Sequence, residues 1–522
     1  MTTTPGAEQR HTATPARLAS PWPAPRTDVE RTFPPTFAWG TATAAYQIEG
    51  AHHTGGRTDS IWDHFSRIPG RVVNGDTGEI ACDHYHRYPA DVALMRDLGV
   101  GTYRFSTSWA RVRPDGGAVS AAGLDFYDRL VDELLGAGIA PWLTLYHWDL
   151  PQALEERGGW RNRDTASLFA EYALDVHAAL GDRVHSWTTL NEPWCSAFLG
   201  HAAGEHAPGM RQDAEALRAM HHLLLAHGHG VAALRAADPS LELGITLNFS
   251  RFAPLDPARE ADRDMARRFW DGMAGCFAGP IFAGAYPEGF LADVADIWPA
   301  DLVRDGDLEL ISAPIDVLGV NYYNSSVVAA PGGDLPDGAV SDGMVHAGPP
   351  GPPDAPGAEG PLPWIAARDA IWIETDVVST EMGWENHPGA FRDLLVEIDR
   401  DLTGPAGTHL VITENGAAYP DDRVGSDGEI DDADRITYLR EHIAAVHEAI
   451  EAGADVRGYL QWTLLDNFEW AHGYGKRFGV VHVDRETLAR TPKASARWYS
   501  RVMSTGTLEA VPGTRPTDGR DA

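Results

Sequence analysis

The stretch "HLVITENG", residues 409–416, has the pattern of a buried β-strand that ends in an acid. Leu410 to Thr413 are apolar or β-branched, and they run directly into Glu414 and the turn-forming pair Asn415-Gly416. Burying an unpaired carboxylate costs free energy, and a neutral residue would end the strand at lower cost. We therefore expect Glu414 to have a chemical role and a partner elsewhere in the chain.

Seven other segments share this strand pattern, and helical segments alternate with them along nearly the whole chain. The eight strands are predicted at residues 37–44, 102–109, 140–148, 185–193, 241–249, 316–324, 409–416 and 456–467. Helical patterns cover roughly residues 86–98, 123–138, 164–180, 213–236, 258–275, 388–403, 432–452 and 492–504. Eight such alternations predict an α/β protein with a parallel sheet closed into a single (β/α)8 TIM barrel with long βα loops, spanning residues 31–504.

The alternative architecture is a doubly wound open sheet. That fold usually has a glycine-rich phosphate loop after its first strand, and "WGTATAAYQIEG" at residues 39–50 is not such a loop. The segment 325–385 is rich in Pro and Gly, and we predict one long loop after the sixth strand. Residues 1–30 and 505–522 lack apolar periodicity, so a disordered N-terminal tail and a flexible C-terminal tail are predicted. Residues 1–30 also lack the apolar core of a secretory signal.

Composition excludes several classes of partner. The chain has 522 residues and a formal net charge of −33, which opposes binding to nucleic acid or to anionic lipid. No run of about 18 apolar residues predicts a membrane span. The three cysteines are too few for a disulfide framework or a thiolate metal site, which favours a reduced, cytoplasmic location. Nothing in the sequence determines the oligomeric state.

Polar and aromatic residues gather at the predicted C-terminal ends of the strands, where a barrel places its active site. In chain order these are Gln47, Glu49, Arg104, Trp109, His147, Trp148, Asp149, Asn191, Glu192, Asn248, Asn321, Tyr322, Tyr323, Glu414, Asn415, Trp462, Asp466, Asn467, Glu469 and Trp470. Each one alone is more easily explained by packing or by core hydrogen bonding. Together they combine carboxylates, amides and indoles, and sugars need both hydrogen-bonding groups and flat apolar faces. With 17 Trp among 522 residues, the set favours a sugar-binding site.

Metal-assisted hydrolysis is the competing chemistry for a barrel, and it needs several His or carboxylate ligands that converge. The stretch "LYHWD" at residues 145–149 supplies one His beside one Asp, and "CDHYH" at 82–86 lies at the start of a predicted helix. No metal and no cofactor are therefore predicted.

The partner of Glu414 is predicted to be Glu192, in "TTLNEP" at residues 188–193. It too ends a strand, and Pro193 follows it. Two glutamates on separate barrel strands can face each other across the barrel mouth, and a pair of carboxyl groups is what cleavage of a glycosidic bond requires.

These motifs resemble family 1 glycoside hydrolases, the β-glucosidase family of retaining enzymes. The resemblance extends from about Phe33 to Met503, over nearly the whole chain outside the tails. The matching segments are "FAWGTATAAYQIEGA" (37–51), "SIWDHF" (60–65), "YRFSTSWARVRP" (103–114), "YHWDLPQAL" (146–154), "TLNEPWCSAFLGH" (189–201), "LGVNYYN" (318–324), "VITENG" (411–416) and "GYLQWTLLDNFEWAHGYGKRFGVVHVD" (458–484). The family's barrel fold agrees with the strand pattern above.

The resemblance implies a role for each matching residue. Glu192 would be the acid/base and Glu414 the nucleophile. Arg104 and Tyr323 would hold the nucleophile, and Asn321 would lie beside the acid/base. The residues implied to bind the terminal sugar are Gln47, His147, Asn191, Tyr323, Glu469 and Trp470, with Trp462 as the stacking floor.

Physical chemistry agrees with these implied roles. A cation and a donated hydrogen bond, from Arg104 and Tyr323, would lower the pKa of Glu414 and favour its ionised form. The negative charge of Glu414 would raise the pKa of Glu192, so that Glu192 starts protonated. In a retaining mechanism the two carboxyl groups are about 5–5.5 Å apart.

Three functions follow from the resemblance. The first is a β-glucosidase that releases terminal non-reducing β-D-glucosyl residues from cellobiose and other β-glucosides, with β-galactosides and β-fucosides as further substrates and a place in cellulose and polysaccharide degradation. The second is a 6-phospho-β-glycosidase, which is expected to carry a small polar residue in place of the Glu-Trp pair and a K-x-Y phosphate clamp. Here Glu469-Trp470 are intact, and Phe478 stands where that Tyr would be. The third is a non-catalytic sugar-binding protein, which would be expected to have lost one of the glutamates.

Overall fold

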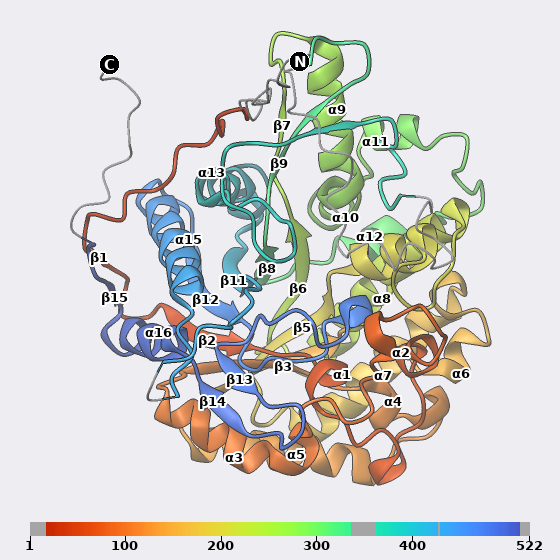
Figure 1. Ribbon diagram of the computed structural model, residues 1–522. Helices are drawn as coiled ribbons and strands as arrows, with labels where there is room; N and C mark the ends of the chain where they lie inside the picture. The colour runs from red at the N-terminus through yellow and green to blue at the C-terminus, as the bar shows by residue number, and fades with distance from the viewer. Residues whose placement is uncertain (1–16, 336–361, 426–427, 512–522) are drawn as a thin grey trace, which may run out of the picture.

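The computed structural model describes residues 17–335, 362–425 and 428–511, and eight parallel strands form a closed barrel at its centre (Figure 1). The barrel strands are β2 (Ala38–Ala42), β3 (Thr102–Ser106), β4 (Ala140–Tyr146), β5 (Ser186–Asn191), β6 (Glu242–Phe249), β8 (Val317–Tyr322), β11 (His409–Asn415) and β12 (Val456–Trp462). They pair in this order, and β12 closes the barrel by pairing in parallel with β2. All eight predicted strands and the predicted TIM barrel are confirmed.

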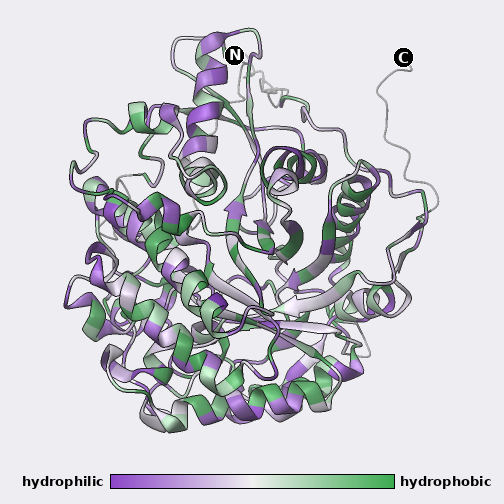
Figure 2. Ribbon diagram, turned by 180° about the vertical axis from the view of Figure 1, so that it is seen from behind, coloured by the Kyte–Doolittle hydropathy of each residue, from purple (hydrophilic) through white to green (hydrophobic). Residues whose placement is uncertain are grey.

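The long helices form a layer around the barrel (Figure 1). They are α3 (His84–Asp97), α5 (Ala121–Gly136), α7 (Asp164–Leu180), α8 (Asp213–Ala237), α9 (Glu260–Trp270), α13 (Pro388–Ile398), α15 (Ala433–Glu451) and α16 (Ala494–Thr505). Shorter helices lie between them: α1 (Ala45–Ile48), α2 (Ile61–Ser66), α4 (Trp109–Val112), α6 (Gln152–Glu155), α10 (Cys276–Ala278), α11 (Glu288–Asp293), α12 (Asp307–Ile311) and α14 (Gly404–Ala406). Figure 2 shows hydrophilic and hydrophobic residues interspersed along these outer helices.

Helix α5 illustrates how the sequence positions this layer. The Ser120 hydroxyl accepts a hydrogen bond from the Gly123 N–H at 3.1 Å and so caps the helix N-terminus. Leu130 and Leu134 are buried against the barrel, while Leu135, on another face, is 41% exposed. Each buried leucine contributes roughly 1.5–3 kcal/mol by leaving water.

The segment 325–385 is not one irregular loop, which corrects the sequence prediction. Strand β9 (Ser326–Ala329) and strand β10 (Ile371–Ile373) pair antiparallel within it, and β9 also pairs in parallel with β7 (Phe252–Pro254). These strands are short apolar runs whose side chains bury against one another, and the Pro- and Gly-rich composition between them hid that pattern. Residues 336–361 lie outside the described part of the chain.

The predicted N-terminal tail is also corrected, because residues 17–30 pack on the domain. Trp22 is only 6% exposed, and its ring contacts that of His387 edge-on at 4.8 Å between centroids. Leu18 forms a β-bridge with Thr375. A single buried Trp in an extended, Pro-rich segment leaves no periodic signal in the sequence. Residues 1–16 of the predicted tail lie outside the described residues.

The predicted C-terminal end of the barrel domain, residue 504, is also corrected. Strand β15 (Thr507–Leu508) pairs antiparallel with β1 (Arg31–Thr32), so the ordered chain continues past residue 504. A second small pair, β13 (Val481–Val483) and β14 (Arg490–Pro492), lies between β12 and α16. Residues 512–522 lie outside the described part.

Replacing Trp22 with Ala is expected to lower the free energy of unfolding by about 3 kcal/mol, because a large buried side chain is removed from a packed cluster with Val327 and Ile373. A urea titration followed by circular dichroism measures the change. Val29→Ala is the matched control, since Val29 is 37% exposed in the same segment. Equal midpoints for the two variants would show that Trp22 contributes no packing energy beyond that of an exposed side chain.

Candidate active site

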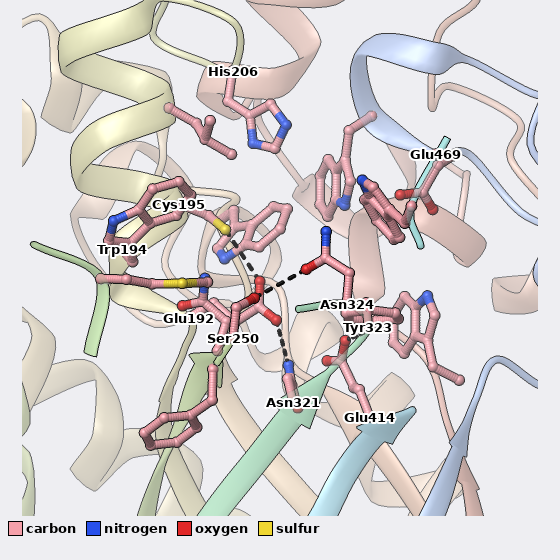
Figure 3. A pocket seen from close by; sticks show the side chains of 18 of the residues that line it. Glu192, Trp194, Cys195, His206, Ser250, Asn321, Tyr323, Asn324, Glu414 and Glu469 are labelled. Carbon is pink, nitrogen blue, oxygen red and sulfur yellow. Dashed lines mark hydrogen bonds between the residues drawn. The ribbon is translucent and has the colours of Figure 1, made fainter. Parts of the chain in front are cut away.

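A cavity of about 890 Å³ that opens to solvent lies at the C-terminal ends of the barrel strands. Three glutamates line it: Glu192, Glu414 and Glu469 (Figure 3). Much of the remaining wall is indole, contributed by Trp148, Trp194, Trp364, Trp372, Trp384, Trp462 and Trp470. The cavity therefore combines buried carboxyl groups with flat apolar faces, which is the mixture that sugar recognition needs.

Glu192 follows the last residue of β5, and its backbone holds the carboxyl group in the cavity. Its φ of 43° lies in the left-handed region, which glutamate rarely adopts. Its N–H donates to the Thr246 carbonyl on the neighbouring strand β6 at 2.9 Å. Oε1 accepts a hydrogen bond from Asn321 Nδ2 at 2.6 Å, and Oε2 accepts one from Cys195 Sγ at 3.1 Å. Both donors to this carboxyl group are neutral.

Glu414 lies near the end of β11 and has different partners. Oε1 accepts a hydrogen bond from Arg104 Nη1 at 2.6 Å, and Oε2 accepts one from the Tyr323 hydroxyl at 2.7 Å. Arg104 is fully buried, so solvent screens this ion pair little. The two carboxyl groups thus differ in one respect that decides their chemistry, because only Glu414 contacts a cation.

One amide links the two glutamates. Asn191 Oδ1 accepts from Arg104 Nη2 at 2.7 Å and from Asn321 Nδ2 at 3.1 Å. Asn191 Nδ2 lies 3.1 Å from His147 Nε2. Because Arg104 holds Glu414 and Asn321 holds Glu192, this network fixes the two carboxyl groups relative to each other.

The pKa values of the two glutamates are set by burial and by these partners. Burial, together with the negative charge of Glu414, raises the pKa of Glu192 to about 7. Burial also raises the pKa of Glu414, while Arg104 and the Tyr323 hydroxyl oppose that rise. The sequence-based expectation of a lowered pKa for Glu414 is therefore wrong in direction, because desolvation outweighs the cation. The cation still makes Glu414 the carboxyl group that ionises first.

Glu469 lies across the cavity from Glu192 (Figure 3), and Gln47 lies beside Glu469. Gln47 Nε2 donates to the Phe468 carbonyl at 2.9 Å and lies 3.5 Å from Glu469 Oε2. Burial and the charges of Glu414 and Glu192 raise the pKa of Glu469 to about 8. Gln47 Oε1 and His147 Nδ1 are buried and make no hydrogen bond within the described residues. Buried polar atoms of this kind usually find partners, so both can accept or donate a bond to a ligand.

Two indoles flank His147. The rings of Trp462 and Trp470 lie 5.8 and 6.0 Å from the His147 ring, centroid to centroid, and are nearly parallel to it. Trp148 and Trp470 both have positive φ, at 79° and 48°. With Glu192, three cavity-lining residues therefore adopt strained backbone, a feature that clusters at functional sites.

Comparison with known proteins gives the family. The model of "Glycosyl hydrolase family 1" matches residues 29–507. The chain belongs to glycosyl hydrolase family 1. This confirms the resemblance inferred from the sequence motifs.

Family 1 relatives align over most of the chain. The thermostable beta-glucosidase B of Thermobispora bispora is 50% identical over 90% of both chains. The bifunctional beta-D-glucosidase/beta-D-fucosidase of Bifidobacterium breve is 47% identical over 90% of this chain and 98% of that protein. Among solved structures, the psychrophilic beta-glucosidase BglU of Micrococcus antarcticus has 49% identity and a TM-score of 0.86, covering 91% of this chain and 98% of its own.

Several polar residues predicted at strand ends are structural in this family 1 chain. Glu49 Oε2 accepts from Arg111 Nε at 2.9 Å, and both side chains are buried away from the cavity wall. Asp466 Oδ1 accepts from Lys493 Nζ at 2.8 Å. Asn415 Oδ1 accepts from the Tyr459 hydroxyl at 2.7 Å. Of the eleven predicted site residues, eight line the cavity. The other three, Gln47, Arg104 and Asn191, each hydrogen-bond a lining residue, namely Glu469, Glu414 and His147.

The sequence analysis missed other residues that line the cavity. They are Trp194, Cys195, His206, Ser250, Asn324 and Trp384, among others. Trp194 and Cys195 follow Glu192 almost directly in "NEPWC", and that proximity is the signal that could have found them. Trp384 lies in the Pro- and Gly-rich region after β8 and carried no comparable signal.

Two other features are absent from the described residues. In residues 17–335, 362–425 and 428–511, no cluster of three His, Cys, Asp or Glu side chains could hold a metal ion. Within the same ranges, none of the helices combines the length and apolar content needed to cross a membrane.

Proposed function

We propose that this family 1 chain is a retaining β-glucosidase that releases terminal non-reducing β-D-glucosyl residues through a covalent glycosyl-enzyme. One observation carries the proposal. Two buried carboxyl groups, Glu192 and Glu414, face one cavity, and only Glu414 contacts a cation. That asymmetry gives one acid and one nucleophile at the same pH. The named activities of the relatives in Thermobispora bispora and Bifidobacterium breve support the same reaction class.

In the first step, Glu414 attacks the anomeric carbon from the α face with an electron pair of its carboxylate. The glycosidic bond breaks, and its electrons pass to the departing oxygen, which takes the proton of Glu192. Glu414 thereby becomes a neutral ester. We expect the two carboxyl groups to be about 5–5.5 Å apart, as this attack requires.

The second step uses the same residues in reverse. Loss of the charge on Glu414 removes the repulsion that kept Glu192 protonated, so Glu192 can now accept a proton from water. The water oxygen attacks the anomeric carbon from the β face, the ester bond breaks, and Glu414 leaves as a carboxylate. Two inversions return the β anomer.

Binding of the terminal sugar is assigned to residues around Glu469. Gln47, His147, Asn191 and Glu469 supply hydrogen-bonding atoms, and Trp470 belongs to the same group. Trp462 supplies a flat face for the C–H side of the ring. Tyr323 lines the cavity and donates a hydrogen bond to Glu414, which supports the assignment of Tyr323 to the sugar site as well.

A 6-phospho-β-glycosidase is disfavoured by the residues on this side of the cavity. Glu469 is a carboxyl group where a phosphate would have to bind, and Phe478 lines the cavity without a hydroxyl. The experiment is a panel of nitrophenyl β-glucoside, β-galactoside, β-fucoside and 6-phospho-β-glucoside. We expect β-glucoside to have the highest kcat/KM and the phosphorylated substrate at most about 1% of it. A preference for the 6-phospho substrate would overturn the assignment.

We also propose a natural substrate and a cellular compartment for this reaction. Cellobiose released during cellulose breakdown is the expected natural substrate. The three cysteines are buried and free, which suits a reducing, cytoplasmic compartment. Growth of a host on cellobiose, with and without the gene, tests the substrate, and cell fractionation tests the compartment.

The pH dependence of kcat/KM should follow the two carboxyl groups. The acid Glu192 must be protonated, so kcat/KM is expected to fall as pH rises through about 7. Glu414 must be ionised, so kcat/KM should also fall at low pH, at a value above the ordinary 4.5 because burial raises its pKa. Phenyl β-glucoside needs protonation of its leaving group and should show both limbs. Dinitrophenyl β-glucoside does not, and an equal basic limb for it would show that this limb does not report Glu192.

A further inference from the structure

The acid/base carboxyl group has one partner that the proposed reaction does not use. Cys195 begins the π-helical turn η5 (Cys195–Ala203) three residues after Glu192. Its N–H donates to the Glu192 carbonyl at 3.0 Å, and its Sγ donates to Oε2 at 3.1 Å. Figure 3 shows this thiol and the Asn321 amide on the same carboxyl group. Cys195 thus donates two hydrogen bonds to Glu192, one from its backbone and one from its side chain.

The two hydrogen-bond partners of Glu192 differ in whether they can accept a hydrogen bond as well as donate one. An amide N–H can only donate, so Oε1, which faces Asn321 Nδ2, must keep a lone pair toward it. A carbonyl oxygen accepts more strongly than a carboxylic O–H oxygen, so the bond from Asn321 favours the acidic proton on Oε2, the oxygen that faces the thiol. A thiol is both a weak donor and a weak acceptor, so it can face Oε2 in either protonation state. Within the described residues, the hydrogen bond that Glu192 Oε2 accepts comes from Cys195 Sγ.

The thiol stays neutral in this place. Burial, together with the nearby charge of Glu192, raises the pKa of Cys195 well above its ordinary value, so the group is S–H across the working pH range. The charged or titratable groups that face Glu192 come from other elements: Glu414 from β11, Arg104 from β3, Tyr323 directly after β8, and Glu469 from the segment after β12. None of these four donates a hydrogen bond to Oε2 of Glu192 within the described residues.

We propose that Cys195 is a positioning residue of the general acid: its thiol holds Oε2 of Glu192 in place for proton transfer, and it does so weakly enough that this oxygen still takes up a proton. The inference rests on the proposed function, in which Glu192 is the acid. A stronger donor at this position would stabilise the carboxylate and weaken proton uptake. An apolar side chain would leave Oε2 without a partner to orient it.

The test compares Cys195→Ser and Cys195→Ala. Serine supplies a stronger donor, so the basic limb of kcat/KM for phenyl β-glucoside should move to lower pH by about half a unit. Alanine removes a bond that lowers the pKa of Glu192, so the limb should move to higher pH. Alanine should also lower kcat/KM for phenyl β-glucoside about tenfold, because the acid is less well placed. For dinitrophenyl β-glucoside, which needs no acid, the loss should stay within about threefold.

The matched control is Cys82→Ser with Cys82→Ala. Cys82 is also fully buried, and its Sγ also donates a hydrogen bond, to the Asp466 carbonyl at 3.3 Å, but it does not line the cavity. These controls should leave the pH limbs unchanged. A merely structural role for Cys195 would lower kcat/KM for both substrates by the same factor and leave the limbs in place, and that result would overturn the inference. If the wild-type protein hydrolyses neither substrate, the proposed function fails instead.

Discussion

Replacing Glu414 with Gly should abolish hydrolysis of β-glucosides, with a loss of at least about a thousandfold, because no group remains to attack the anomeric carbon. The variant leaves a space on the α face that Arg104 and Tyr323 still border. Glu192 is still present as an acid. Added azide should enter this space, attack once with inversion, and give an α-glycosyl azide.

Replacing Glu192 with Ala should give the opposite anomer. Glu414 can still displace dinitrophenolate, which needs no proton, and the glycosyl-enzyme should accumulate because no base activates water. Azide needs no base, so it should attack this intermediate from the β face and give a β-glycosyl azide. Proton NMR of the products distinguishes the anomers.

The control for both variants is Glu171→Ala, because that carboxylate is exposed and paired with Arg113 on the outside of the barrel. It should hydrolyse normally and give no azide product beyond that of the wild type. The same anomer from Glu414→Gly and Glu192→Ala, or wild-type hydrolysis by either, would refute the assigned roles.

Replacing Glu469 with Ser should lower kcat/KM for nitrophenyl β-glucoside by roughly a hundredfold to a thousandfold. Glu469 is half-buried at the cavity wall beside Gln47, where it can accept hydrogen bonds from sugar hydroxyls. A buried polar site built for such bonds discriminates strongly when one partner is lost. Steady-state kinetics with the wild type as reference measures the loss. Glu486→Ser removes an exposed acid and serves as the control.

A loss within about threefold of wild type would remove Glu469 from the sugar site. A loss confined to kcat, with KM unchanged, would place its contact in the transition state alone.

The sequence predicts the barrel well because each strand carries its own local signal. "HLVITENG" has four apolar or β-branched residues followed by polar ones, and the other seven strands are likewise short runs that alternate with helical patterns. The carboxyl ends of parallel strands meet at one edge, so the polar residue at each strand end can be placed without knowing any contact. That is why Glu192 and Glu414 could be paired from the sequence although they lie far apart in the chain.

Other features depend on contacts that no local pattern reveals. Trp22 lies in a Pro-rich segment, and its burial against His387, together with the bridge between Leu18 and Thr375, shows that the segment packs on the domain. The pKa of Glu414 depends on how completely the site is desolvated, and the neighbouring residue types give only the opposing contribution. Position near a strand end also predicts too many site residues. Glu49 is included for that reason, but it pairs with Arg111 in the interior.

At Glu192, selection for turnover and selection for stability favour different residues. Holding a glutamate in its positive-φ backbone conformation costs about 1 kcal/mol or more, and the repulsion of Glu414 adds to that cost. Asparagine tolerates the same conformation better and carries no charge. A duplicated copy of this gene that was no longer selected for turnover would therefore gain stability by exchanging its acid. Such a lineage would lose catalysis early and keep its barrel.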